Sequence, residues 1–372
     1  MTRTRASFAL VTVAAAAAVA LPASPASAAP AKGLQDQEMT VNHPDLRIKF
    51  LEDAKAANVT FLRFNTRWNG KSGLPDRSQL DAIRDTIALA PSYGIEQVLI
   101  APTVTGGTSF NPKGKKRGPT AASKISLSAY KTYIRAVANS FEDLPNIEML
   151  YAPLNEPNWY RHIPKRGGAT MYRRLHNAAY DEIKKIDSDA KILFGELAPY
   201  ARPLSKNFPN GQSTDPGDFV REVLGLDSKW RSKGSRKTYT VKADGVSLHT
   251  YDFKADPRKK RKDRDQWTQA NLGYAKADLR KAARTKRLPS KAVSNLHITE
   301  FAYKTAGSDR IPVTRARTYL TRAWSIAKKQ KVKSFVWYQL RDPQSRDVLW
   351  QSGLKTKSGS SRSTWSTFRT MR

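Results

Sequence analysis

The chain has 372 residues, no cysteine and a formal net charge of +33, with 65 lysines and arginines against 32 aspartates and glutamates. Without cysteine it cannot be a small disulfide-stapled module, so a fold of this chain must be stabilised by a large hydrophobic core. The charge favours an acidic partner such as an anionic glycan, a cell-wall polymer or nucleic acid, or it serves solubility alone.

The first 28 residues have the pattern of a secretory signal peptide. Two arginines precede an almost wholly apolar stretch at residues 8–21, and Ala26-Ser27-Ala28 supplies the small residues of a cleavage site. We therefore expect a secreted protein whose mature domain covers residues 29–372. The apolar stretch is short for a membrane span and no later stretch approaches the needed length, so we expect no transmembrane anchor.

Strand-like and helix-like segments alternate along the mature chain. Helices are marked by apolar residues at three- and four-residue steps, as at Leu80, Ile83 and Ile87, and one begins at the capping residue Ser126. Strands are predicted at residues 33–37, 59–64, 95–101, 147–151, 191–197, 243–249, 292–300 and 332–338. Helices are predicted at residues 45–57, 80–90, 126–141, 169–186, 218–226, 266–284 and 312–331.

Eight strand–helix units in a chain of this length predict a single-domain α/β fold, a (β/α)8 barrel. The alternative is an open, doubly wound α/β sheet. That fold would need a glycine-rich phosphate loop after its first strand, and neither GxGxxG nor GxxxxGK[ST] occurs there.

Two glutamates stand at the ends of predicted strands. Asn155-Glu156-Pro157 closes the fourth strand, where proline cannot continue a sheet, and Glu300 closes the seventh. The carboxyl ends of barrel strands meet at one end of the barrel, so we expect the two carboxylates to face each other across a cleft. A facing pair of glutamates is the machinery of glycosidic bond hydrolysis.

The other residues expected at this end of the barrel are polar or aromatic, a composition that suits sugars. They are Arg63, Asn65, Trp68, His249, Tyr251, Trp337 and Gln339. Five scattered histidines and no cysteine give no cluster of metal ligands, so we expect neither a catalytic metal nor a cofactor.

The sequences Tyr-Ala-Pro-Leu-Asn-Glu-Pro-Asn at residues 151–158, Ile-Thr-Glu-Phe at 298–301 and Phe-Val-Trp-Tyr at 335–338 resemble clan A glycoside hydrolases. The cellulase-like family 5 and the xylosidase-like family 39 are the most similar. One departure is that family 5 often has a histidine after the third strand, where this chain has Ala101-Pro102-Thr103-Val104.

The resemblance implies a retaining double displacement on β-linked glycans. It implies that Glu156 is the general acid/base and Glu300 the nucleophile, with Arg63 and Tyr251 orienting Glu300. It further implies that Asn155 binds the sugar 2-hydroxyl, that His249 lines the subsite and that Trp337 forms its floor.

Each of these residues also has a purely structural interpretation. The glutamates could be surface carboxylates, Asn155 a turn cap and Arg63 an ion-pair partner within the barrel. His249 and Trp337 could be core residues. Two further residues receive no role: Glu196 closes the fifth strand, and His297, whose strand parity is opposite to that of Glu300, is expected to pack under a helix.

Four basic clusters could account for the charge. Those at residues 113–117, 161–166 and 258–264 follow strands and are expected around the cleft, whereas the one at residues 229–237 is expected at the opposite end. They support an alternative function, a non-catalytic, secreted polyanion- or wall-binding protein on a degenerate barrel. No recognition module or interleaved aromatic residue points to nucleic acid, and we expect a monomer.

Overall fold

The computed structural model describes residues 29–70, 73–104, 125–160, 162–163, 166–201, 213–344 and 350–372. The predicted signal peptide, the basic cluster at residues 113–117, and Arg161 and Lys165 of the cluster at residues 161–166 lie outside the described residues. Within the described part of the chain, no helix is both long and apolar enough to cross a membrane.

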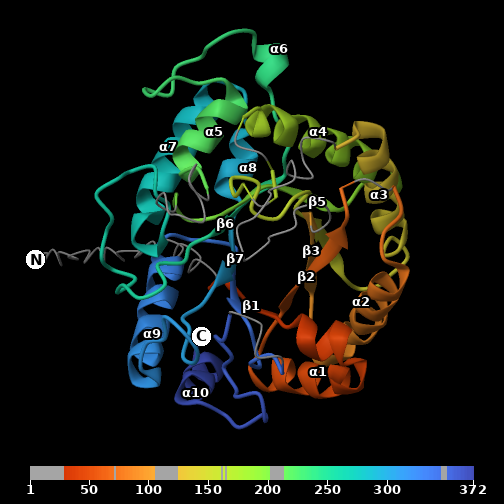
Figure 1. The fold of residues 1–372 in the computed structure, drawn as a ribbon, viewed down its shortest axis with the longest axis vertical. Helices are drawn as coiled ribbons and strands as arrows, with labels where there is room; N and C mark the ends of the chain where they lie inside the picture. The colour runs from red at the N-terminus through yellow and green to blue at the C-terminus, as the bar shows by residue number, and fades with distance from the viewer. Residues whose placement is uncertain are drawn as a thin grey trace, which may run out of the picture.

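Eight parallel strands close into a barrel in which each strand pairs with the next and the last pairs with the first (Figure 1). This closure confirms the predicted (β/α)8 barrel and contradicts an open sheet. The strands are β1 (Ala31–Gln35), β2 (Phe61–Trp68), β3 (Gln97–Val104), β4 (Glu148–Tyr151), β5 (Lys191–Leu197), β6 (Gly245–His249), β7 (Leu296–Phe301) and β8 (Ser334–Tyr338).

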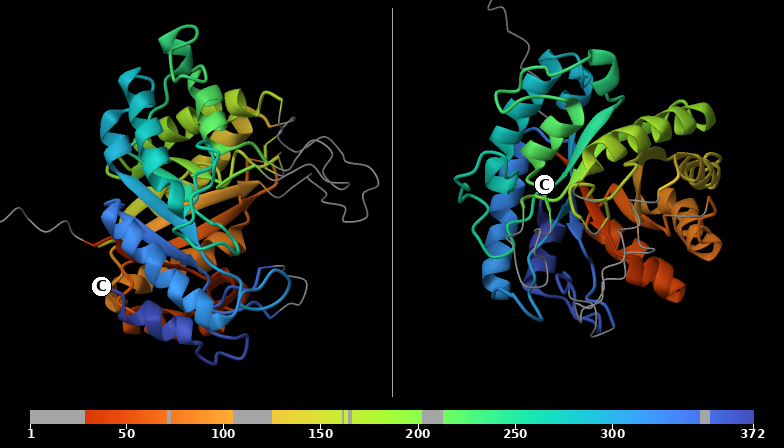
Figure 2. Two further views of the ribbon diagram at one scale, coloured as in Figure 1. Left: turned by 90° about the vertical axis from the view of Figure 1, so that its left-hand side faces the viewer. Right: turned by 45° about the horizontal axis from the view of Figure 1, so that its top comes forward.

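Helices surround the barrel on its outside (Figures 1 and 2). They are α1 (Arg47–Ala56), α2 (Arg77–Leu89), α3 (Leu127–Asn139), α4 (Gly168–Ile186), α5 (Pro216–Leu224), α6 (Arg236–Tyr239), α7 (Leu272–Arg284), α8 (Ser290–Ser294), α9 (Val313–Lys329) and α10 (Ser363–Thr370). The cap predicted at Ser126 is confirmed, because its side chain accepts a hydrogen bond from the backbone N–H of Ala129.

Alternate residues of each strand point into the barrel. The interior is filled by apolar side chains in or directly after five strands: Phe61, Leu99, Ala101, Leu150, Ala152, Leu193 and Val336. Further along β2, and at the end of β1, the inward side chains become polar, with Arg63, Asn65 and Gln35 hydrogen-bonded to one another. The carboxyl end of the barrel is therefore the polar end, where barrels of this kind carry their active sites.

Two strands near that end contain β-bulges. In β5 the pairing with β6 passes from Gly195 to Leu197 and skips Glu196, and in β7 the pairing with β6 passes from Ile298 to Glu300 and skips Thr299. A bulge inserts one residue and changes which side chains face inward after it. Both bulges therefore re-aim polar side chains toward the centre of the barrel.

Some predicted boundaries differ from the structure. The first strand begins and ends two residues before its predicted range, and the first residues of the predicted seventh strand form α8 instead. Helix α10, which was not predicted, packs against α9 near the start of β1 (Figure 1). The Nζ of Lys32 in β1 donates to the backbone carbonyls of Phe368 and Met371, at 3.1 and 2.9 Å, so the last helix is attached to the first strand.

Candidate active site

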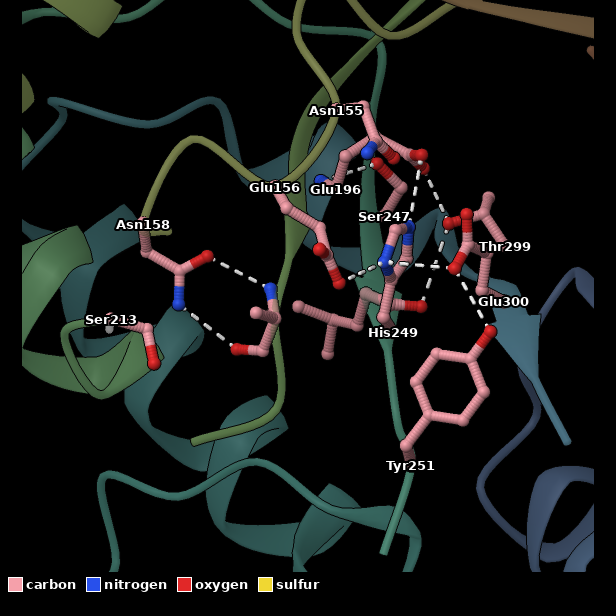
Figure 3. Close-up of polar contacts among 12 residues, drawn as sticks. Asn155, Glu156, Asn158, Glu196, Ser213, Ser247, His249, Tyr251, Thr299 and Glu300 are labelled. Atoms are coloured by element: carbon pink, nitrogen blue, oxygen red, sulfur yellow. Dashed lines mark hydrogen bonds and ion pairs between the residues drawn. The ribbon is translucent and has the colours of Figure 1, made fainter. Parts of the chain in front are cut away.

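Three glutamates surround one histidine at the carboxyl end of the barrel (Figure 3). The Nδ1 of His249 lies 3.0 Å from Glu156 Oε1 and 3.4 Å from Glu300 Oε2, and its Nε2 lies 3.0 Å from Glu196 Oε2. One carboxylate oxygen of Glu156 and one of Glu300 lie within 4.8 Å of each other. The two glutamates predicted to face each other therefore do meet.

His249 is a buried imidazolium in this arrangement. Both of its ring nitrogens face carboxylate oxygens, and only the protonated ring can donate from both. Burial alone would lower the pKa of His249, but the negative charges of Glu300 and Glu196, with hydrogen bonds to Glu156 and Glu196, raise it to about 10. The histidine is therefore positively charged at neutral pH.

Arg63 is the second buried cation of the site. Its Nη2 lies 2.6 Å from Glu196 Oε2, and its Nη1 lies 2.7 Å from Glu300 Oε1. Burial opposes the charge of Arg63, but Glu196 and Glu300 outweigh that effect and raise its pKa. Three carboxylates thus face two fixed cations, and a proton on one carboxyl group would leave the site neutral.

Glu300 is held by donors on both of its oxygens. Arg63 contacts Oε1, and the hydroxyl of Tyr251 donates to Oε2 over 2.9 Å. The side chain remains 13 % exposed, so a substrate can reach it. Arg63 and Tyr251 therefore fix the orientation of a carboxylate that a substrate can reach, as a nucleophile requires.

Glu156 occupies a strained turn directly after β4. Its φ of +44° lies in the left-handed region, which residues other than glycine seldom adopt, and its backbone N–H donates to the carbonyl of Glu196 over 2.9 Å. The side chain is 15 % exposed and faces a small pocket that Trp159, Tyr200 and Phe253 help to line. A proton on Glu156 can therefore reach a group bound beside it.

Asn155 is brought to the same cluster. Its Oδ1 accepts a hydrogen bond of 2.7 Å from Nη2 of Arg63, which fixes the orientation of the amide. The side chain is almost fully buried in this structure. With its oxygen engaged by Arg63, the amide nitrogen is the atom that remains to address a ligand.

The structure contradicts the prediction that Trp337 forms the floor of a sugar subsite. Trp337 is fully buried and its indole N–H donates to the carbonyl of Ser352 over 3.0 Å. The reason is strand parity: Ser334 and Val336 point into the barrel, so Phe335 and Trp337 point outward to the helices. Tyr338 has the inward parity and is half-buried, and Glu300 and Glu156 are among the charges that raise its pKa, after burial itself.

Trp68 is likewise unavailable to a ligand. It is 1 % exposed and packs against the rings of Tyr130 and Tyr133, with centroids 5.1 and 5.3 Å away. Both of these aromatic residues of the predicted set therefore belong to the core, and Tyr338 is the aromatic residue of β8 that lies at the site.

Two residues inside the barrel, one of them in the site, were not placed there from the sequence. Glu196, which was given no role, lies at the centre of the network, and the only local sign is the glycine before it. His297 was expected under a helix, but it lies inside the barrel beside Phe61, 6.3 Å between ring centroids, and within 3.0 Å of the Ser334 hydroxyl. The bulge at Thr299 changes the parity between His297 and Glu300, which invalidates the argument from alternation.

Glu156, His249 and Glu300 also form the one group of three potential metal donors among the described residues. A metal ion requires a neutral imidazole with a free lone pair. His249 instead uses both nitrogens against carboxylates and is cationic, so it already supplies the positive charge at this position. The donor set therefore does not fit a metal site.

A much larger cavity, of about 840 Å³, opens at the opposite end of the barrel. Lys32, Lys333 and Arg372 are among its lining residues, and none of the predicted site residues reaches it. Barrels of this kind carry their chemistry at the carboxyl ends of the strands, so the volume of this cavity does not make it the active site.

Comparisons with known proteins agree with the fold. No protein-family model matches the sequence, and no curated protein matches it. A family 39 glycoside hydrolase from Bacteroides cellulosilyticus WH2 has a similar structure at 16 % identity and a TM-score of 0.61, covering 92 % of this chain and 63 % of that one. The chain thus spans less than two thirds of the length of that protein.

Two further structures are similar over most of their own length. A GH5_18 protein from Streptomyces cattleya, in complex with GlcNAc, is 14 % identical with a TM-score of 0.59, covering 92 % of this chain and 79 % of that one. A β-glucosidase from Thermotoga maritima, in complex with deoxynojirimycin, is 14 % identical with a TM-score of 0.58, covering 88 % and 86 %. The expected resemblance to clan A glycoside hydrolases is confirmed at the level of the fold.

Proposed function

We propose that the protein is a retaining glycoside hydrolase that cleaves β-linked poly- or oligosaccharides. The observation that carries this proposal is the pair of carboxylate oxygens of Glu156 and Glu300 within 4.8 Å. Retaining enzymes hold their two carboxyl groups about 5–5.5 Å apart, whereas inverting enzymes separate them by about 6.5–9.5 Å to admit a water molecule.

In the first step an oxygen of Glu300 attacks the anomeric carbon of the sugar. The bond from that carbon to the glycosidic oxygen breaks, and Glu156 gives its proton to the departing oxygen. The products are a glycosyl ester on Glu300, a released alcohol and an ionised Glu156. The contacts of Arg63 and Tyr251 with Glu300 keep the attacking carboxylate oriented.

In the second step Glu156 acts as a base. It takes a proton from a water molecule, whose oxygen attacks the anomeric carbon while the ester bond to Glu300 breaks. The sugar leaves with its original anomeric configuration, and both glutamates return to their starting states. Asn155 is assigned to the sugar 2-hydroxyl, and Tyr338 replaces Trp337 as the ring on which the reacting sugar stacks.

The test uses Glu156→Gln and Glu300→Gln, assayed on aryl β-glycosides and on a panel of glycans that includes acidic polysaccharides. Each variant is expected to lose at least about a thousandfold in kcat, since both residues act in bond cleavage. The control is Glu182→Gln, which alters a buried carboxylate on α4 that is paired with Lys131 and Arg135. If both site variants turn over a substrate as fast as the parent does, the assignment is wrong.

Stereochemistry separates the retaining mechanism from the inverting one. Proton NMR of the first product formed from a β-glycoside is expected to show the β-anomer. An α-anomer as first product would contradict the double displacement.

We also infer that the protein is exported after cleavage before Ala29, and that it acts as a monomer. The basic, apolar and small-residue segments of residues 1–28 support export. Mass spectrometry of the protein from the medium of producing cells, with Ala29 as its first residue, is the expected result.

A second candidate function, binding of a polyanion, is supported by the positive charge that the described residues place on the flank of the barrel. The arginines of the cluster at residues 258–264 are partly neutralised, because Arg258 and Arg264 lie 3.0 and 3.3 Å from Asp256 and Asp278. In contrast, α9 contains no acidic residue, and its exposed cations are Arg315, Arg317, Lys328 and Lys329. Salt-sensitive sedimentation with an acidic wall polymer, without release of reducing sugar, would favour binding over hydrolysis.

A further inference from the structure

Glu196 is a buried carboxylate at the centre of the site that the proposed reaction leaves without a role. Its side chain is 0 % exposed, so it cannot touch a sugar. Its Oε2 receives hydrogen bonds from Arg63 Nη2 at 2.6 Å, Arg63 Nε at 3.2 Å and His249 Nε2 at 3.0 Å. Its Oε1 accepts from the hydroxyl of Thr299.

The backbone is shaped to place this side chain. Glu196 is the extra residue of the β5 bulge and has a left-handed φ of +53°. The glycine before it has a φ of +128°, and a Cβ there would lie 2.2 Å from the carbonyl oxygen of Ser247. Strain of this kind persists only where the surroundings hold it in place, and it is common at functional sites.

The contact between Glu196 and Nε2 decides how His249 presents its other nitrogen. With Nε2–H given to Glu196, the Nδ1–H points at the gap between Glu156 Oε1, at 3.0 Å, and Glu300 Oε2, at 3.4 Å (Figure 3). One proton on a fixed ring thus lies within reach of both reacting carboxylates.

We infer that Glu196 is a positioning residue, which keeps His249 as an imidazolium and aims its Nδ1–H at the oxygens of Glu156 and Glu300. This inference rests on the proposed hydrolysis. During glycosylation the negative charge of Glu300 is consumed in the ester bond, and a new one appears on Glu156. A cation fixed between the two stabilises the charge in both places, and the ring does not have to move.

The charges around the pair are consistent with this role. His249 faces Glu156 after β4, Glu196 on β5, Glu300 on β7 and the ring of Tyr251 after β6. Arg63 and His249 outweigh burial and lower the pKa of Glu196, which holds it ionised. Two further titratable groups lie near Glu196: the pKa of His297 is lowered to about 4, and that of Tyr172, whose hydroxyl accepts from the Gly195 N–H, is raised, in both cases mainly by burial.

The test is the variant Glu196→Gln, which keeps the shape of the side chain and removes its charge. We expect kcat to fall at least about tenfold with KM changed less than about threefold, because stabilisation is lost in the transition state and not in substrate binding. The alkaline limb of the pH profile is expected to move down by at least about one pH unit, because His249 loses its proton more readily. An unchanged profile with wild-type kcat would overturn the inference.

A second readout needs no substrate. In proton–nitrogen NMR of the imidazole rings, His249 of the parent is expected to stay protonated beyond pH 8, and in Glu196→Gln to titrate at a lower pH. His249→Asn assigns its signal among the five histidines. This readout keeps the two proposals separate: no hydrolysis of any glycoside defeats the proposed function, and an unshifted His249 defeats the role of Glu196.

Thr299→Val is the milder variant should Glu196→Gln fail to fold. It removes only the hydroxyl that donates to Glu196 and is expected to shift the His249 titration in the same direction by a smaller amount. Glu182→Gln serves again as the control and is expected to leave the titration and the pH profile unchanged. A shift in Glu182→Gln equal to that in Thr299→Val would show a general effect of buried charge and would contradict the inference.

Discussion

Two neighbouring residues of β8 show how a one-residue difference in parity separates a ligand-facing ring from a core ring. Tyr338 continues the inward series that begins with Ser334 and Val336, and it remains half-buried at the site. Trp337 points the other way and packs with Phe301 and Phe335 beneath the helices. Trp337 was predicted from its position at the end of the strand and from the resemblance to clan A glycoside hydrolases, whereas the alternation along the strand favours Tyr338.

The pair gives a matched prediction. Tyr338→Ala is expected to lower kcat/KM about tenfold through lost stacking, which corresponds to about 1.4 kcal/mol, with little change in stability. Trp337→Phe is expected to cost about 1–3 kcal/mol of unfolding free energy, through lost volume and the lost hydrogen bond to Ser352, with KM unchanged. Steady-state kinetics and urea denaturation of both variants measure the two effects, and the opposite pattern would restore Trp337 as the platform.

His249 gives a prediction for stability against pH. Its folded-state pKa of about 10 lies above the ordinary histidine pKa of 6.5, so its contribution to stability is fully present below pH 6.5 and is lost as pH rises through 10. The difference in unfolding free energy between the parent and His249→Asn should therefore shrink steadily between these two values. Urea denaturation at several pH values tests this, and a constant difference across the range would contradict the buried imidazolium.

At the scale of elements, the two β-bulges build the site. Without the extra residue in β5, Glu196 would not reach Arg63 and His249, and without the one in β7, Thr299 and Glu300 could not both serve the centre. The extra residue of the β5 bulge, Glu196, has a left-handed backbone conformation. The extra residue of the β7 bulge, Thr299, directly precedes the reacting Glu300. The barrel thus gains its most important contacts where its regular pairing is interrupted.

Gly195→Ala tests the bulge directly. The new Cβ would meet the Ser247 carbonyl at 2.2 Å, so we expect a loss of about 3 kcal/mol in unfolding free energy and a lowered alkaline limb, as in Glu196→Gln. Gly273→Ala is the control, because a Cβ at that position in α7 meets only a side-chain atom 3.9 Å away. It is expected to be neutral or about 0.5 kcal/mol more stable. Equal behaviour of the two variants would argue against a strained bulge.

The same bulges mark the limit of prediction from the sequence. The barrel and its strand order follow from alternating strands and helices, and the meeting of Glu156 with Glu300 follows from their strand-end positions. The network around Glu196 cannot be predicted in this way. The alternation of inward and outward side chains along a strand assumes unbroken pairing, and it fails after each bulge. His297 was misplaced for this reason, while α10, the eight-residue helix that follows β8 and completes the eighth strand–helix unit, was missed.

At the scale of the whole molecule, the positive charge is distributed unevenly. Helices α7 and α9 are neighbours, since Gln269, just before α7, donates to the carbonyl of Ala323 in α9 over 2.7 Å. The one acidic residue of α7, Asp278, is buried and paired with Lys281 at 2.8 Å. The exposed charges on this flank are therefore positive, whereas α2 carries Asp81 and Asp85 beside its arginines.

Charge reversal on this flank gives the last prediction. We combine Arg280→Glu, Arg284→Glu, Lys328→Glu and Lys329→Glu in one variant. It is expected not to sediment with an acidic polysaccharide at low salt, because each lysine or arginine that neutralises an anionic group of the polymer contributes to the salt-dependent affinity. Hydrolysis of a small neutral aryl glycoside should be unchanged, since all four residues lie on the helical shell. If the variant sediments with the polysaccharide as fully as the parent does, the positive charge of this flank serves solubility and not binding.

The attachment of Lys32 to the end of α10 has a consequence for the order of assembly. The ammonium group of Lys32 donates to the backbone carbonyls of Phe368, Arg369 and Met371, which follow it in the chain by 336 to 339 residues. Until those carbonyls arrive, the lysine has to stay in water and β1 cannot settle fully against β8. The barrel is therefore expected to complete its closure only after residues 368–371 have been synthesised.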